Sequence, residues 1–297
     1  MIVFVAAQIL PGNVARARLG PFADQRSVDV LNHQLGTDKP LLTQYWSWIS
    51  GFVHGDFGQS LVFNSAVRPY VFNALQHSLK LATVAFVIVV PLSILGGIIA
   101  ALRYGKPTDR IITTVGLTAT VIPEFVSGIV LIIVFGVALN VLPISATAAP
   151  GAGPVDQIYH LLLPAMPLGL VLFGYIARMA RAGTIASLDA DYTRTAYLKG
   201  LARAVVVRRH VLRNALLPTI TVIASQVTYL IGGLVVIEIL FNYQGIGLLI
   251  FSSANAKDFP MLESGVLTVA IIAMLASLLA DIAYSLLNPR IRHASAE

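Results

Sequence analysis

Long apolar runs alternate with shorter polar and basic segments along most of the chain. A membrane-spanning helix needs about 20 consecutive apolar residues. Five runs have that length, and they cover residues 74–102, 111–139, 158–177, 214–240 and 264–287. The pattern predicts an all-α fold, a polytopic transmembrane helical bundle.

Residues 1–10 form a sixth apolar run that is too short to cross a bilayer. Ten helical residues extend about 15 Å, half of the hydrocarbon thickness. We therefore expect six spans of which the first is truncated, either because an apolar upstream stretch with a basic start is missing or because the first helix is only half inserted.

The charged residues fix an orientation for these spans. Basic residues gather in segments 103–110 and 178–213 and after residue 288, whereas segments 140–157 and 241–263 hold only Lys257. Short loops rich in Lys and Arg stay cytoplasmic. We expect a multi-pass protein of the bacterial inner membrane with a cytoplasmic C-terminus.

This orientation divides the chain into four parts. They are a truncated first helix (1–10), an external segment (11–73), a transmembrane domain (74–288) that contains the cytoplasmic loop 178–213, and a cytoplasmic tail (289–297). In the external segment, aromatic residues lie between turn-forming glycines, as in a small cap on the membrane surface. Both an interfacial aromatic belt and a docking surface for an external partner fit this composition.

Composition excludes several other classes of protein. Hydrophobic residues make up 57% of the chain and charged residues 11%, against about 25% charged in soluble domains. The net charge of +6 lies in short segments between apolar runs, so we expect no nucleic-acid partner. Without cysteine, there is no disulfide and no Cys-ligated metal. The chain has no zinc-protease helix motif, no nucleophile elbow and no phosphate-binding Gly-Lys loop, and its six histidines are dispersed.

The cytoplasmic loop 178–213 has the features of a folded segment. Asp189 or Asp191 can cap a helix, Tyr192, Ala196 and Lys199 then share one face, and Gly200 can end it in the left-handed conformation. A second basic helical stretch follows at 201–214. The pattern fits either a surface helix made basic by the positive-inside rule or a helix presented to a cytoplasmic partner.

The residues of this loop resemble a known family. Residues 191–201 read Asp-Tyr-Thr-Arg-Thr-Ala-Tyr-Leu-Lys-Gly-Leu and continue into Arg-His-Val-Leu-Arg-Asn-Ala-Leu-Leu-Pro at 209–218, which is similar to the cytoplasmic loop of ABC-importer permeases of the oligopeptide/dipeptide/nickel branch. Shorter matches to the same family occur in order along the chain, at 10–12, 35–41, 55–60, 238–247, 258–260 and 288–292.

The resemblance implies that the loop is a coupling helix seated in a groove of an ATPase subunit. The residues implied in this contact are Asp191, Tyr192, Arg194, Thr195, Ala196, Lys199 and Gly200. Where relatives often have an acidic residue before the aspartate, this chain has Ala190, whose side chain offers no polar group.

The resemblance also implies a function and partners. The chain would be a permease subunit, not an enzyme, forming half of the pore of an ATP-driven importer. Its partners would be a second homologous permease, two cytoplasmic ATPase subunits that bind ATP and Mg, an external substrate-binding protein and membrane lipid. The chain itself would bind no cofactor. Dipeptides, oligopeptides, nickel chelates, glutathione and opines all remain as substrates. The alternatives are an ATP-independent secondary transporter or channel and, less favoured, an intramembrane enzyme.

Polar residues inside the spans are candidates for the translocation path, because ionisable groups there are costly. Glu124 follows Pro123 near the middle of the run 111–139. We expect it either to line the path and meet a cationic part of the substrate or to pair with a polar residue on a neighbouring helix. Gln226, with Ser225 and Thr228, is a weaker candidate, since such side chains commonly bond across helices.

Two further acids, Glu238 and Asp281, lie near span ends, where a structural role is favoured. Prolines 91, 164, 167 and 218 fall within or at the ends of spans and predict kinks.

Overall fold

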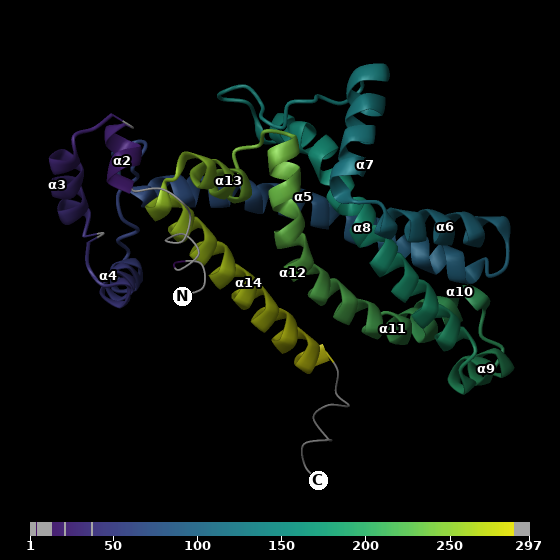
Figure 1. Cartoon of the computed structure of the whole chain (residues 1–297). Helices are drawn as coiled ribbons and strands as arrows, with labels where there is room; N and C mark the ends of the chain where they lie inside the picture. The colour runs from purple at the N-terminus through teal and green to yellow at the C-terminus, as the bar shows by residue number, and fades with distance from the viewer. Residues whose placement is uncertain (1–3, 5–13, 21, 37, 288–297) are drawn as a thin grey trace, which may run out of the picture. The chain divides into compact units, whose positions relative to one another are not determined.

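The computed structural model describes residues 4, 14–20, 22–36 and 38–287, and these residues are almost entirely helical (Figure 1). Most of the predicted first helix, residues 1–10, and all of the tail, residues 289–297, lie outside the described residues. Within the described ranges, β pairing amounts to one isolated bridge between Gln59 and Ala66. The helices are α2 (Val14–Leu19), α3 (Gln25–Leu35), α4 (Leu41–Val53), α5 (Val67–Leu102), α6 (Pro107–Val121), α7 (Glu124–Leu131), α8 (Pro154–Leu188), α9 (Asp191–Leu198), α10 (Arg203–Val206), α11 (Leu212–Ala215), α12 (Leu217–Leu240), α13 (Ile246–Ala256) and α14 (Phe259–Leu287), with π-helical segments η1 (Ile132–Ala138) and η2 (Val207–Val211).

Four described helices, α5, α8, α12 and α14, are long and apolar enough to cross a membrane. The pair of α6 with α7 and η1 adds a fifth if it counts as one bent span. The all-α transmembrane fold is thus confirmed with four or five candidate spans, and the sixth falls on residues outside the description.

The predicted span over 111–139 is broken into two helices. Between Val121 and Glu124 the helix axis turns by 113°. Pro123 causes the break because a proline disfavours helical geometry in the preceding residue and has no N–H to donate. Ile122 accordingly adopts extended backbone, with φ −72° and ψ 125°, and α7 begins afresh at Glu124.

Other prolines leave their helices continuous. Pro91 lies inside α5, and Pro164 and Pro167 lie inside α8. Pro218 falls in the first turn of α12, where its missing N–H removes no intrahelical hydrogen bond.

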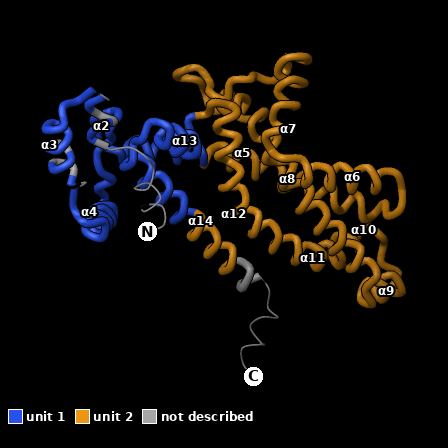
Figure 2. Tube along the Cα trace, viewed as in Figure 1, with its two compact units in different colours: residues 1–78, 244–272 blue, residues 79–243, 273–297 orange. Residues whose placement is uncertain are grey.

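The chain divides into two compact units, coloured blue and orange in Figure 2. The first comprises residues 1–78 and 244–272, and its core contains Phe57, Val71, Ile246 and Met261. In the segment of this unit that was predicted to be external, aromatic rings pack on one another, with Phe52 and Phe57 stacked at 4.3 Å between centroids, while Trp46 remains 67% exposed.

The second unit comprises residues 79–243 and 273–297. Its core is built around α8, and the buried side chains of Leu163, Leu172, Ile176 and Ile237 lie at its centre. Helix α8 is the most buried of the candidate spans, and α6, α7 and α12 pack on it. This arrangement places the break between α6 and α7 directly beside α8 and α12.

Candidate functional site

Helix α9 and its connections form the segment that the sequence predicts to be a cytoplasmic loop. Helix α8 ends at Leu188, α9 begins three residues later at Asp191, and it ends at Leu198. Gly200 has φ +78°, the left-handed conformation predicted for it, and the Leu201 N–H donates to the Ala196 carbonyl at 3.3 Å. This pattern closes the C-terminus of a helix and sends the chain sharply away.

The predicted boundaries of the loop and the predicted cap need correction. Arg178 and Arg181, assigned to the loop, lie inside α8, and the loop proper starts at Asp189. Neither aspartate caps α9: Asp189 ends α8, Asp191 is the first helical residue, and the N-cap is Ala190 without a side-chain hydrogen bond. The carboxylate of Asp191 still lies in the first turn, where its negative charge stabilises the helix through the helix dipole.

The second helical stretch, predicted over 201–214, exists but is irregular. It consists of α10, the π-helical η2 and α11 in succession. Its residues Val206, Val211 and Ala215 form a small core with Ala196 of α9.

Helix α9 has a buried face and an exposed face. Thr193 is buried and donates from Oγ1 to the Ser187 carbonyl at 2.7 Å. Ala196 is 5% exposed. The other six residues implied in coupling are exposed: Asp191, Tyr192, Arg194, Thr195, Lys199 and Gly200. A short helix anchored by Thr193 and Ala196 therefore presents polar and aromatic side chains outward. Ala196, predicted to share one face with Tyr192 and Lys199, is buried, whereas those two residues are exposed.

Glu124 lies at the break between α6 and α7, as the first residue of α7. Its carboxylate packs on α12 at Gly233: a Cβ added to this glycine would lie 2.6 Å from Oε2. The Tyr229 hydroxyl, one turn earlier on α12, hydrogen-bonds the same carboxylate. Among the described residues, no lysine, arginine or histidine forms an ion pair with Glu124.

The three polar residues predicted on α12 have different partners. Ser225 donates to the Val222 carbonyl of its own helix at 2.8 Å. Thr228 pairs with Ser277 of α14 at 3.0 Å, which is the interhelical bond expected of a structural residue. Gln226 is different, because its Oε1 is buried with no hydrogen-bond partner in the described structure.

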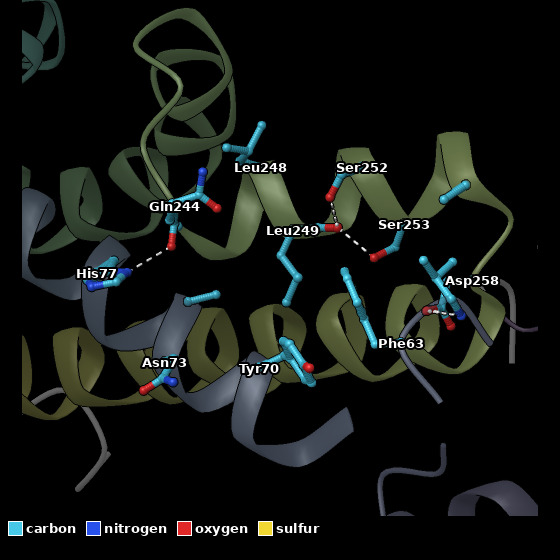
Figure 3. Close-up of a pocket in the computed structure, with 14 residues that line it drawn as sticks. Phe63, Tyr70, Asn73, His77, Gln244, Leu248, Leu249, Ser252, Ser253 and Asp258 are labelled. Carbon is cyan, nitrogen blue, oxygen red and sulfur yellow. Dashed lines mark hydrogen bonds between the residues drawn. The ribbon is translucent and has the colours of Figure 1, made fainter. Parts of the chain in front are cut away.

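The first unit contains a pocket of 340 Å³ between the start of α5 and α13 (Figure 3). His77 Nδ1 lies within hydrogen-bonding distance of the Gln244 carbonyl oxygen, at 2.9 Å. The aromatic rings of Phe63 and Tyr70 line the pocket. Asp258 at one end accepts from the Ser60 hydroxyl and the Leu61 N–H. The pocket thus offers neutral polar groups, and its carboxylate is already engaged within the protein.

Two features of the described chain were missed in the sequence. Asp109, 3% exposed, forms an ion pair with Arg181, although Arg181 had been read only as a topology signal. Glu263 on α14 is 4% exposed, and its Oε1 has no partner among the described residues. Glu263 is the last residue of the segment 241–263 and directly precedes the apolar run 264–287, so no local signal in the sequence separates it from the preceding loop.

Comparison with known proteins gives consistent matches over the whole chain. The family model for the binding-protein-dependent transport system inner membrane component matches residues 93–293, and the model of the N-terminal part of such membrane components matches residues 1–77. The glutathione transport system permease protein GsiC of Escherichia coli (strain K12) is 36% identical over 293 residues, covering 99% of this chain and 93% of that protein. GsiC of Shigella dysenteriae serotype 1 matches to the same extent.

One solved structure is similar in fold. The crystal structure of an amino acid ABC transporter with histidines has a TM-score of 0.52 and 17% sequence identity, and the match covers 75% of this chain and 94% of that one. At this identity the similarity concerns the fold alone.

Proposed function

Because this chain belongs to the family of inner membrane components of binding-protein-dependent transport systems and is a permease subunit of an ABC importer, we propose that it forms half of the translocation pore and that α9 couples this pore to a cytoplasmic ATPase. It is a multi-pass inner membrane protein. In this family the ATPase is a separate subunit, so the chain is not itself an enzyme.

The observation that carries the coupling proposal is the division of α9 into two faces. Thr193 and Ala196 fix the helix to the end of α8 and to the core of η2 and α11. Tyr192, Arg194 and Lys199 are exposed. A force on the exposed face is transmitted to α8 because the anchor residues are buried and hydrogen-bonded.

The proposed complex has a second homologous permease, two ATPase subunits that bind ATP and Mg, and an external substrate-binding protein. The C-terminus lies in the cytoplasm with α9, in agreement with the basic residues of the loop. For the substrate we propose a peptide-like solute, because the glutathione permeases match this chain over nearly its full length. Dipeptides and longer peptides belong to the same chemical class.

Reconstitution tests this function directly. The permease pair is placed in proteoliposomes with its ATPase subunits and binding protein, and uptake of labelled glutathione and alanyl-alanine is measured with ATP inside. We expect uptake that needs both ATP and the ATPase subunits. Uptake by the permease alone would instead support the ATP-independent transporter or channel.

A charge change on α9 tests the coupling face. Arg194→Glu reverses an exposed charge on α9, and Arg203→Glu makes the same change at an exposed position on α10. We expect Arg194→Glu to weaken co-purification of the ATPase subunits and Arg203→Glu to leave it closer to the wild-type level. Equal effects would show that the contact depends on general basicity and not on α9.

A further inference from the structure

The polar residues around the broken helix have the chemistry of a cation site. Glu124 supplies a carboxylate, and Tyr229 supplies a hydroxyl that contacts it. The third group is the unpartnered, buried Oε1 of Gln226. Each of these oxygens can accept a hydrogen bond, and an alkylammonium group has three N–H donors to offer.

Helix geometry aligns these groups. Gln226, Tyr229 and Gly233 follow one another at intervals of three and four residues, so they share one face of α12. Gly233 packs against the Glu124 carboxylate, which shows that this is the face turned toward the start of α7. Gln226 and Tyr229 flank the midpoint of Leu217–Leu240, so the site lies at mid-depth of a candidate span.

The surroundings of Glu124 leave its charge without a protein cation. The ion pairs of the described residues are His33 with Asp38, His160 with Asp156 and Arg181 with Asp109. Arg178 on α8 lies over the ring of Tyr175, with 5.6 Å between its guanidinium carbon and the ring centre, and it takes part in none of these ion pairs. An acid in an apolar span without a basic partner is costly unless something pairs with it.

We propose that Glu124, Tyr229 and Gln226 form a binding site for the ammonium group of the transported solute. The proposal rests on the proposed function and adds to it a substrate class, solutes with a free amino terminus. The break at Pro123 makes α7 begin at Glu124, with the carboxylate against α12 at mid-depth. A continuous helix would run past this face of α12 and would not begin there.

Side-chain size at residue 233 gives a test that keeps every charge. A methyl group at Gly233 would lie 2.6 Å from the Glu124 carboxylate and displace it, whereas a methyl group at the adjacent Gly232 meets nothing within 4 Å. Gly233→Ala and Gly232→Ala make the same change in helix propensity and differ only in this contact. Glu124→Gln removes the charge itself, and Gln226→Leu removes the amide.

The experiment uses the complex of permease and ATPase subunits without binding protein, so that only the pore selects. Equilibrium binding is measured for glutathione and alanyl-alanine and for their N-acetyl derivatives, which lack the ammonium group. For the wild type we expect binding of the free amines about tenfold or more tighter than of the N-acetyl forms, as for a charge-assisted hydrogen bond. Glu124→Gln and Gly233→Ala should lose this preference, Gln226→Leu should reduce it, and Gly232→Ala should keep it.

Two outcomes overturn the inference: a wild-type complex without the preference, or Glu124→Gln and Gly233→Ala proteins that retain it. Co-purification with the ATPase subunits and an unchanged melting temperature confirm that the variants fold. Failure of the proposed function is a different result, in which the wild-type importer shows no ATP-dependent uptake of any peptide-like probe.

Discussion

The Asp109 carboxylate and the Arg181 guanidinium form a two-point ion pair, with Nε to Oδ1 at 2.6 Å and Nη2 to Oδ2 at 2.9 Å. The carboxylate is nearly fully buried and also accepts from the Gly105 N–H at 3.0 Å. The Arg181 guanidinium lies 5.3 Å from the ring centre of Tyr104. The pair therefore fixes the start of α6 and the turn after α5 to α8, seven residues before α8 ends and the path to α9 begins.

Arg181→Gln should destabilise this end of the second unit. Removing the guanidinium leaves a buried carboxylate without its cation, for which we expect a loss of about 3 kcal/mol in the free energy of unfolding. Thermal and urea unfolding of the detergent-solubilised protein measure it. Arg178→Gln, one turn earlier on the same helix, removes an arginine with no carboxylate partner in the described structure and should cost well under half as much. Equal losses of unfolding free energy in the two variants would show that the ion pair of Asp109 with Arg181 does not stabilise this region.

Gly200→Val should uncouple ATP hydrolysis from uptake. The left-handed backbone of Gly200, with φ +78°, costs a non-glycine residue about 1–2 kcal/mol, and a β-branched side chain is among the least suited to it. A Cβ at this position meets nothing within 4 Å, so the effect is conformational: the exit from α9 shifts while the core is untouched. The measurement is solute taken up per ATP hydrolysed, which we expect to fall severalfold.

Gly151→Val is the matched control for Gly200→Val. Gly151 has φ +82° and equally open space for a Cβ, but it lies in the segment between η1 and α8, away from α9 in the chain. In Gly151→Val, the amount of solute taken up per ATP hydrolysed should remain near the wild-type value. The same fall in both variants would indicate general destabilisation and argue against α9 as the link.

The sequence predicted those features of the site that depend on local signals. A short helix before Gly200 and the left-handed conformation of Gly200 follow from a loop motif and a glycine at a helix end, and both were found. The cap was wrong because Asp189 is taken into the last turn of α8, which extends eleven residues beyond the apolar run that ended at residue 177. Hydropathy marks where a helix leaves lipid and does not mark where it ends.

Contacts between distant segments were not predictable in the same way. Asp109 and Arg181 are 72 residues apart, and nothing local distinguishes Arg181 from the other basic residues that set the topology. Pro123 was read as a proline inside one span, but a 113° turn requires neighbours that accept the separated half-helices. Gly233 is one such neighbour, because it has no side chain where the Glu124 carboxylate lies.

Asp258→Asn should loosen the segment before α5 in the first unit. The Asp258 carboxylate accepts from the Ser60 hydroxyl and from the N–H groups of Leu61 and Val62, and it also faces the Met261 N–H in the first turn of α14. Loss of the charge weakens several hydrogen bonds at once, and we expect the free energy of unfolding to fall by about 2 kcal/mol. Hydrogen exchange at the amides of Leu61 and Val62 should accelerate.

Asp156→Asn is the control for Asp258→Asn. Asp156 lies in the first turn of α8, and its side chain is 49% exposed, so it loses only a weak surface interaction with His160. Exchange at Leu61 and Val62 should stay at the wild-type rate in this variant. Unchanged exchange in Asp258→Asn itself would show that the carboxylate does not hold the segment.

Gly174→Ala should separate α6 from α8, whereas Gly116→Ala should be tolerated, although the two glycines face each other. A Cβ on Gly174 would overlap the Gly116 carbonyl oxygen and Thr120 Cγ2, but a Cβ on Gly116 would lie 3.4 Å from the Gly174 Cα, an ordinary contact. Close helix approach in a membrane depends on such small residues, and overpacking costs about 1–3 kcal/mol. We expect a lower melting temperature for Gly174→Ala and little change for Gly116→Ala. If Gly116→Ala were as destabilising, the approach of the two helices would have to be closer on the α6 side than the structure shows.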